Sequence, residues 1–298
     1  TMVALMDSRS IAATAANGGI LTGADELDIE YSNKTYHFDR TIYEKRVYDG
    51  WQKEDPSVEL VFGPNIKDWP KMPELTEDMI IKLVSHITDP VTTTDELIPS
   101  GETSSYRSNP IRLAEFTLSR KDPAYVGNAK KVHAYEIARE EGKNPAVNFE
   151  ELKAVYDSIK RIEGFEDIDP LKIGIGSTIY ANKPGDGSAR EQAASCQRVL
   201  GAWANIAKEY ATKRYRSNLI NWGIIPFLIE DENEIAKDDF IFIPNIREAI
   251  LQKNDRIKAY VLRDEIKEIH LSIGHLTDHE REILVSGSLI NYNRKNRN

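Results

Sequence analysis

The sequence predicts an α/β fold in which helices surround a central mixed β core. Apolar runs typical of strands alternate with segments of helical periodicity. Their alternation lacks the even rhythm of a doubly wound parallel sheet, and residues 256–262 with 265–273 have the pattern of an antiparallel hairpin. The 298 residues, 40% of them hydrophobic, are enough to bury a sizeable core.

Residues 1–80 are expected to be the tail of a preceding domain followed by an extended connector. Small residues at 10–16 favour a short helix, which Asn17-Gly18-Gly19 ends. A hairpin is expected over residues 27–40. The stretch 43–73 is rich in Tyr, Trp and Pro, so it is interpreted as a connector that packs its aromatic side chains.

Residues 81–298 are expected to form the main domain, with a strand entering it at 80–86 and a polar loop at 88–110. The other predicted strands are 172–179, 219–229, 240–244 and the hairpin pair. The predicted helices are 113–119, 130–141, 149–162, 188–210 and 279–286, the last stopped at Gly287.

Composition excludes several classes of protein. The formal net charge of −9 disfavours a broad nucleic-acid footprint or binding to an anionic membrane. Cys196 is the single cysteine, so the chain can form neither an internal disulfide nor the set of thiolates that holds an iron–sulfur cluster. No run approaches the ~20 apolar residues that span a bilayer, and the start has no signal-peptide pattern. These features predict a cytoplasmic protein, and the abrupt start suggests a piece of a longer one.

The most informative stretch is the loop at residues 185–191, Gly-Asp-Gly-Ser-Ala-Arg-Glu, which follows a predicted strand and opens a predicted helix. Its two glycines let backbone amides approach a ligand closely. A helix N-terminus carries partial positive charge, and Arg190 can grip a carboxylate with two parallel bonds. The loop therefore suits a carboxylate or phosphate. The alternative is a capping box, in which Ser188 caps the helix and Glu191 reaches back to it.

A second candidate is the polar loop that holds Thr93-Thr94-Asp95 and, further on, Arg107. Long polar loops in compact domains are often functional. The alternative is an ordinary turn-rich loop, with Arg107 as a surface cation or an ion-pair partner.

Together these loops resemble motifs of the aconitase and isopropylmalate-dehydratase superfamily. The run at 185–194 resembles the family's Gly-x-Gly-Ser-Ser-Arg-Glu-His-Ala-Ala, and residues 218–227 resemble its Asn-Leu-x-x-x-Gly-Leu-Leu-Pro-Leu. Residues 93–95 resemble its Thr-Thr-Asp-His, with Glu96 in place of His, and 285–291 its closing Ala-Gly-Ser-Ala-Leu-Asn. The matches keep the same order from the first residues to nearly the last.

The resemblance implies the C-terminal swivel domain of an aconitase-like hydratase, with the swivelling β/β/α fold, preceded by a short tail of the neighbouring domain. Ser188 would then be the general base. Arg107 and Arg190, with Gly187 and Ala189 beside them, would contact substrate carboxylates. By the same resemblance, Asp95 would be a polar catalytic residue that orients a neighbour or forms an ion pair.

The resemblance further implies a [4Fe–4S] cluster in the parent protein, bound outside this chain, with no cofactor bound by the chain itself. The expected partners are the N-terminal cluster-binding domains of the same parent and a small hydroxy di- or tricarboxylic acid; neither a membrane nor a nucleic-acid partner is expected. Such a swivel domain would dehydrate and rehydrate substrate only with the cluster domains, so the chain alone would be inactive.

Two departures from the family pattern lie beside the expected base. Ala189 replaces a Ser and Gln192 replaces a His, which leaves the substrate open. Residues 113–169 match no part of the family closely, so an insertion is expected there.

Other residues have plainer interpretations. Cys196 is expected to be a buried structural thiol, and the His275/His279 pair lacks a third metal ligand. The basic run 208–216 is either a solvated face or a source of positive potential near the substrate loop. The alternative function is a non-catalytic RNA- or metabolite-binding module, and a third possibility is an α/β domain whose Gly-rich loop is only a cap.

Overall fold

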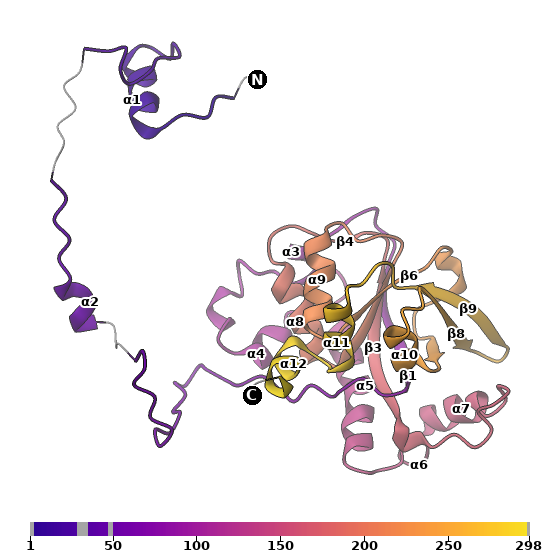
Figure 1. Ribbon diagram of the computed structural model, residues 1–298. Helices are drawn as coiled ribbons and strands as arrows, with labels where there is room; N and C mark the ends of the chain where they lie inside the picture. The colour runs from indigo at the N-terminus through magenta and orange to yellow at the C-terminus, as the bar shows by residue number, and fades with distance from the viewer. Residues whose placement is uncertain (1–2, 29–34, 47–49, 297–298) are drawn as a thin grey trace. The chain divides into compact units, whose positions relative to one another are not determined.

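The computed structural model describes residues 3–28, 35–46 and 50–296, shown in Figure 1. Two compact units make up the chain, residues 1–60 and 61–298, and each is described by itself. The predicted boundary at residue 80 stays a prediction, although the first strand of the second unit begins close to it, at Asp78.

The first unit contains the predicted short helix α1 (Ser8–Ala16). The carboxylate of Asp7 accepts hydrogen bonds from the amides of Arg9 and Ser10 and so caps its first turn. The helix ends where Gly18 and Gly19 adopt positive φ angles of 67° and 87°. A second helix, α2, spans Thr41–Arg46. The turn of the predicted hairpin at 27–40 lies outside the described residues.

The second unit is built on a closed barrel of seven strands in the order β1-β3-β5-β6-β9-β8-β7. Strands β1, β3, β5 and β6 run parallel to one another, and the remaining pairs are antiparallel. The mixed β core is therefore confirmed. The barrel strands are β1 (Asp78–Ile87), β3 (Ile173–Ala181), β5 (Ala202–Ala207), β6 (Ile225–Leu228), β7 (Phe240–Ile243), β8 (Arg256–Leu262) and β9 (Ile266–Ser272).

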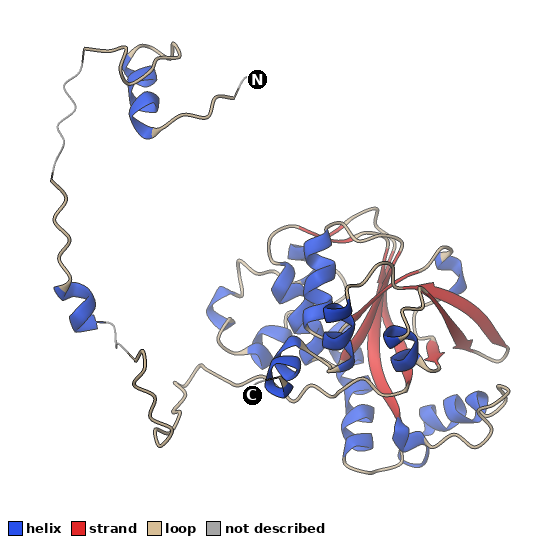
Figure 2. Ribbon diagram, viewed as in Figure 1, coloured by secondary structure: helices blue, strands red, loops and turns tan. Residues whose placement is uncertain are grey.

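Helices cover this barrel, as Figure 2 shows, so the surrounding helices are confirmed as well. Residues 113–169, where an insertion is expected, lie in the connection from β1 to β3 and include α5, α6 and α7. The helices of the second unit are α3 (Thr94–Leu97), α4 (Pro110–Ala114), α5 (Tyr125–Glu140), α6 (Pro145–Asn148), α7 (Glu150–Ile159), α8 (Arg190–Val199), α9 (Lys213–Asn221), α10 (Ile246–Leu251), α11 (Asp278–Val285) and α12 (Leu289–Lys295).

Strand β1 contributes side chains to two hydrophobic cores. Successive side chains of a strand point to opposite faces. Ile80 and Val84 pack in the core shared with α4, α5, α7 and α8, whereas Met79, Ile81 and Leu83 pack in a second core with β5–β9, α10 and α11. Along β1, β3, β5 and β7 the barrel wall is buried on both sides, which explains why these strands are apolar runs. Strand β8, in contrast, alternates buried and exposed residues.

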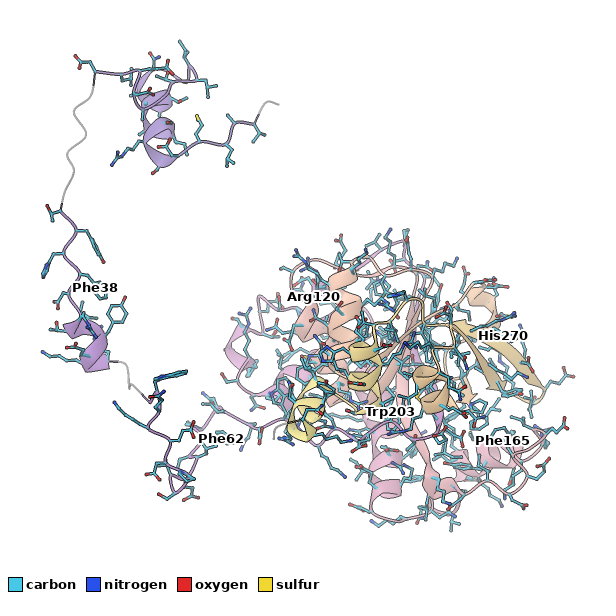
Figure 3. The ribbon with its side chains drawn as sticks, viewed as in Figure 1. Phe38, Phe62, Arg120, Phe165, Trp203 and His270 are labelled. Carbon is cyan, nitrogen blue, oxygen red and sulfur yellow. The ribbon has the colours of Figure 1, made fainter. Side chains whose placement is uncertain are left out.

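The predicted helix at 188–210 is wrong in its second half. Helix α8 ends at Val199, Gly201 follows with φ at 87°, and 202–207 is the barrel strand β5. Trp203, labelled in Figure 3, therefore lies on a strand, and its ring lies directly over Gly174 and Gly176 of β3. Any side chain at either glycine would collide with that ring. The glycines of β3 and the tryptophan of β5 are therefore complementary, which favours the pairing of these two strands.

The predicted strand at 219–229 begins too early, because residues up to Asn221 belong to helix α9 and only 225–228 form β6. The predicted helix at 113–119 is displaced, since α4 ends at Ala114. The strands at 80–86, 172–179 and 240–244, the helices at 130–141, 149–162 and 279–286, and the C-terminal hairpin are confirmed to within a few residues.

Residues 67–76, which we call the strap, lead into β1 along the surface of the second unit. The backbone amide of Lys67 donates to the carbonyl of Ser108, and the Trp69 ring packs against the Trp222 ring with centroids 4.4 Å apart. The buried Arg198 guanidinium donates to the carbonyl of Pro73. The expectation that this connector packs its aromatic rings thus holds at Trp69 but is wrong at Trp51 and Phe62, which are mostly exposed.

Candidate functional site

The candidate site lies at one edge of the barrel, where three neighbouring parallel strands end. Strands β1, β3 and β5 end at Ile87, Ala181 and Ala207. The loops that follow them lead to α3, α8 and α9 respectively. In parallel sheets the carboxyl ends of the strands are where ligands bind, because the loops and helix starts converge there.

A small second sheet joins the two loops that sequence reasoning singles out. Strand β2 (Thr92–Thr93) runs parallel to β4 (Pro184–Asp186), with Thr93 opposite Asp186. Asp95 and Ser188 each follow two residues after that pair. The structure therefore brings the Asp95 loop and the Ser188 loop together.

Both glycines of the 185–188 loop are required by close contacts. Gly185 has φ at 97°, and a Cβ there would lie 2.3 Å from the Tyr215 ring. Gly187 has φ at 132°, and a Cβ there would lie 2.2 Å from Oγ1 of Thr94. The loop is thus held between α9 on one side and α3 on the other, in a backbone conformation that other residues rarely adopt.

Ser188 does not cap helix α8, so the capping-box alternative is wrong. The N-cap residue is Ala189, which offers no side-chain cap bond, and Ser188 is exposed. The Glu191 carboxylate does not reach back; it accepts a hydrogen bond of 3.1 Å from the indole N–H of Trp222. The Ser188 hydroxyl is left available at the start of a ten-residue helix.

Ser188 opens onto a shallow hollow of about 360 Å³ between the first turns of α8 and α9, which we call the α8–α9 hollow. Its size falls within the range typical of ligand sites. It is lined by Ser188, Arg190, Glu191, Lys213, Arg214, Ser217 and Asn218.

The α8–α9 hollow is rich in positive charge. Arg190, Lys213 and Arg214 line it, and within the described ranges none of the three forms an ion pair or a side-chain hydrogen bond. The Nε atom of Arg190 is buried without any partner among the described residues. A buried donor of this kind is costly to leave unsatisfied, so an acceptor from a ligand would stabilise the arrangement.

Asp95 and Arg107 lie outside the α8–α9 hollow. Asp95 is exposed on α3, and its carboxylate pairs with the guanidinium of Arg120 at 2.8 Å. Figure 3 labels Arg120, which also contacts Glu102. Arg107 follows the short 3-10 helix at 104–106, is exposed, and is not among the residues lining the α8–α9 hollow. The structure thus places Ser188 and Arg190 together and leaves Arg107 apart from them.

Beneath the Gly185 loop lies a buried polar cluster that sequence reasoning misses. The Tyr215 hydroxyl accepts hydrogen bonds from the side-chain amides of Gln197 (2.9 Å) and Asn205 (3.0 Å). All three side chains are fully buried, and burial raises the pKa of Tyr215. The cluster ties α8, β5 and α9 together under Gly185. No local motif marks it, because its three members lie on three different elements, α8, β5 and α9.

The residues of this chain do not fit an iron–sulfur cluster. Cys196 is buried, and burial raises the pKa of its thiol to about 12, which disfavours the thiolate that a cluster needs. Across the part of the chain that the structure describes, no group of three or more His, Cys, Asp or Glu side chains is arranged to hold a metal ion. The expectation that Cys196 is a buried structural thiol is confirmed.

None of the helices in the described ranges combines the length and the apolar character needed to cross a membrane.

Comparisons with known proteins agree with this architecture. A family model described as Aconitase C-terminal domain matches residues 171–232, which include the Ser188 loop and the start of α9. The methanogen homoaconitase small subunit of Methanocaldococcus jannaschii is 36% identical over 135 residues, covering 44% of this chain and 70% of that subunit.

Two further proteins are similar over longer stretches. Aconitate hydratase A of Rickettsia bellii is 24% identical over 224 residues, which are 67% of this chain but only 24% of that protein. A crystal structure of 3-isopropylmalate dehydratase from M. jannaschii matches with a TM-score of 0.44 and 23% identity, covering 73% of this chain and 95% of that one.

The chain therefore belongs to the aconitase superfamily, as the identity across most of the homoaconitase small subunit shows. It contains a region that is similar to the aconitase C-terminal domain and to the homoaconitase small subunit.

Proposed function

We propose that this chain supplies the general base and the carboxylate-binding cations of an aconitase-type hydro-lyase. The observation that carries the proposal is the Ser188 hydroxyl, which is exposed, does not cap its helix, and lies in the α8–α9 hollow with the unpaired Arg190. The proposed reaction removes water from a hydroxy di- or tricarboxylic acid, or adds it back.

In this proposal the Ser188 alkoxide takes the proton from the carbon next to a substrate carboxylate, and the C–H electron pair forms the double bond. The hydroxyl on the neighbouring carbon leaves with its bonding electrons and becomes water by taking up a proton from solvent. A serine is a poor base in water, since its alkoxide is too unstable. Here the partial positive charge at the start of α8 and the guanidinium of Arg190 stabilise the alkoxide. The same Arg190 binds a substrate carboxylate in a bidentate manner.

The remaining site residues have supporting roles in the proposal. Gly187 lets the backbone approach substrate, and Ala189 leaves the first turn of α8 without a second hydroxyl. Asp95 orients the edge of the site through its ion pair with Arg120. Arg107 binds a further carboxylate once substrate and partner domains close over the edge, because no acidic group of the described chain neutralises it.

The proposal also assigns partners. A [4Fe–4S] cluster, which provides Lewis-acid chemistry when bound, belongs to cluster-binding domains of the parent protein or to a separate large subunit. The chain alone is expected to be inactive, and a cytoplasmic location stays a prediction.

The decisive test uses the full-length parent with its cluster rebuilt under anaerobic conditions. Hydration of cis-aconitate is followed by loss of its ultraviolet absorbance. Ser188→Ala should lower kcat by roughly 10²- to 10⁴-fold, the usual contribution of a general base, while KM changes little. Ser158→Ala, which removes a hydroxyl from α7 outside the site, is the matched control and should keep full activity.

Three outcomes separate the possibilities. Full activity in Ser188→Ala removes Ser188 as the base while keeping the family. Turnover by the isolated chain contradicts the partner assignment. Absence of turnover with an intact cluster points to a different hydroxy acid, which the departures at Ala189 and Gln192 would then explain.

A further inference from the structure

The basic run 208–216 is divided by the fold into cations that are used structurally and cations that are not. Lys208 pairs with Glu232 at 2.5 Å, and the Arg216 guanidinium donates to the carbonyls of Ile273 and His275. Lys213 and Arg214, in the first turn of α9, make no such contact with any described residue and both line the α8–α9 hollow. Both are exposed, so the fold itself does not need them.

The neighbourhood makes this lack of partners significant. The chain carries 48 acidic residues against 39 basic ones, and nearby lysines find partners readily. Lys183, in the loop before Ser188, pairs with Glu209 at 2.7 Å, and Lys121 pairs with Asp89 at 2.8 Å and Glu96 at 3.1 Å. Three cations around one hollow are left with a single acid, Glu191, whose carboxylate accepts the Trp222 indole N–H.

We propose that Lys213 and Arg214 form a subsite that binds the substrate carboxylate farthest from Ser188. This inference rests on the proposed function, which places one carboxylate at Arg190 beside Ser188. A substrate that spans the hollow from Arg190 to α9 then places a second carboxylate against Lys213 and Arg214. The hollow of about 360 Å³ has room for such a polyanion.

The positions of helices α8 and α9 also favour an anionic ligand. Helices α8 and α9 follow the parallel strands β3 and β5, so both begin at the same edge of the barrel. Their first turns add partial positive charge to that of the three side chains. A monocarboxylic acid bound at Arg190 leaves the α9 cations unneutralised, whereas an acid with a second carboxylate at the far side of the hollow satisfies them.

The test is a binding titration of the full 298-residue chain, in which binding is measured by calorimetry and by NMR chemical-shift changes. The probes are propane-1,2,3-tricarboxylate and pentanoate, which share a five-carbon chain; pentanoate has only the one carboxylate that Arg190 would bind. Lys213→Gln/Arg214→Gln should weaken binding of the tricarboxylate by roughly 10- to 100-fold, the usual effect of losing charge-assisted hydrogen bonds. Binding of pentanoate should change less than about threefold, because that probe lacks a second carboxylate for the pair to bind.

Controls separate this effect from net charge. Lys153→Gln/Lys160→Gln removes the same two charges from the exposed surface at α7 and should leave both affinities unchanged. Figure 1 shows α7 and α9 at opposite ends of the unit. Inorganic phosphate is a third probe. Phosphate binding as tight as that of the tricarboxylate, an equal loss for both carboxylic acids, or no saturable tricarboxylate binding would each overturn the subsite.

The two proposals can fail separately, because the titration needs no turnover. If tricarboxylate binding depends on Lys213 and Arg214 but the assembled enzyme shows no hydratase activity, the subsite is supported and the proposed function is rejected. The opposite result is also possible. If the assembled enzyme is active and Ser188→Ala lowers kcat, but Lys213→Gln/Arg214→Gln leaves the KM for a tricarboxylate unchanged, the proposed function is supported and the subsite is rejected.

Discussion

Single side chains decide whether the Ser188 loop keeps its shape. Tyr215 supports that loop from below, since its ring fills the space next to Gly185 and its hydroxyl accepts from two buried amides. Tyr125 is equally buried, but its hydroxyl has no partner within the described ranges. The two tyrosines therefore form a natural pair for testing how much a satisfied buried hydroxyl contributes.

Tyr215→Phe should lower the free energy of unfolding by about 1–3 kcal/mol, because the amide of Asn205 loses its acceptor while still buried. Tyr125→Phe should leave it within about 0.5 kcal/mol or raise it, since no hydrogen bond is lost. Urea denaturation of both variants measures this. Equal effects would show that the Tyr215 cluster contributes no net stability.

The local sequence predicts some of the residues of the candidate site. Ser188 and Arg190 stand out because a Gly-rich loop before a helix is a local pattern, and the structure places them in one hollow. The capping-box alternative fails because the helix starts one residue later than that pattern requires. Arg107 also stands out, yet the fold keeps it out of the hollow, since its loop bends at a 3-10 helix that no motif announces.

Among the elements, the strap depends on backbone contacts that side chains would prevent. Gly287 follows α11 with φ at 83°, and a Cβ there would lie 2.1 Å from the carbonyl oxygen of Pro73. Gly223 follows α9, and a Cβ there would lie 2.0 Å from the carbonyl oxygen of Gly287. The ends of α9 and α11 and the strap therefore meet backbone to backbone.

Gly287→Ala should destabilise the protein much more than Gly274→Ala. Gly274 has a comparable φ of 68°, but a Cβ there would have Nη2 of Arg216 as its nearest neighbour, 4.0 Å away. Both variants incur the cost of a left-handed backbone, roughly 1–2 kcal/mol. Gly287→Ala adds a backbone clash worth about 1–3 kcal/mol more. Thermal unfolding of the two variants measures the difference, and identical transitions would contradict the close approach.

The element that sequence reasoning misses, β5, shows what local pattern lacks. Its residues, Ala-Trp-Ala-Asn-Ile-Ala at 202–207, continue the small apolar composition of α8 and contain good helix formers. Pairing with β3 and β6 in the barrel decides for the strand, because Trp203 fits over the two glycines of β3. Long-range packing here overrides propensity, which is a weak preference.

For the molecule as a whole, one half-buried carboxylate ties the barrel to its helical cover. Glu151 of α7 receives hydrogen bonds from Lys82 of β1, from Lys131 of α5 and from the Tyr135 hydroxyl. Burial opposes ionisation of Glu151, but these three partners outweigh it and lower the pKa to about 2. Three elements of the second unit, β1, α5 and α7, therefore meet at one ionised group.

Glu151→Gln should be less stable than the parent at neutral pH, and the difference should disappear in acid. Because the folded pKa of about 2 lies below the usual 4.5, the stabilisation is complete above pH 4.5 and is lost as pH falls toward 2. Urea denaturation between about pH 7 and pH 2.5 covers the window in which the two pKa values differ and measures the gap. Glu150→Gln, at the exposed neighbour, should run parallel to the parent; a gap that stays constant with pH would reject the ionic role of Glu151.

The sequence by itself determined the family, the mixed α/β class, and the loop that carries Ser188 and Arg190. These are local or order-preserving features, which a short motif or a hydrophobic period records directly. The tertiary structure alone decided that β1, β3 and β5 end at a common edge, that Thr93 pairs with Asp186, and that Lys213 and Arg214 face the hollow beside Ser188. Closing the barrel brings these groups together, because strand register and pairing, which no local pattern encodes, determine which loops meet.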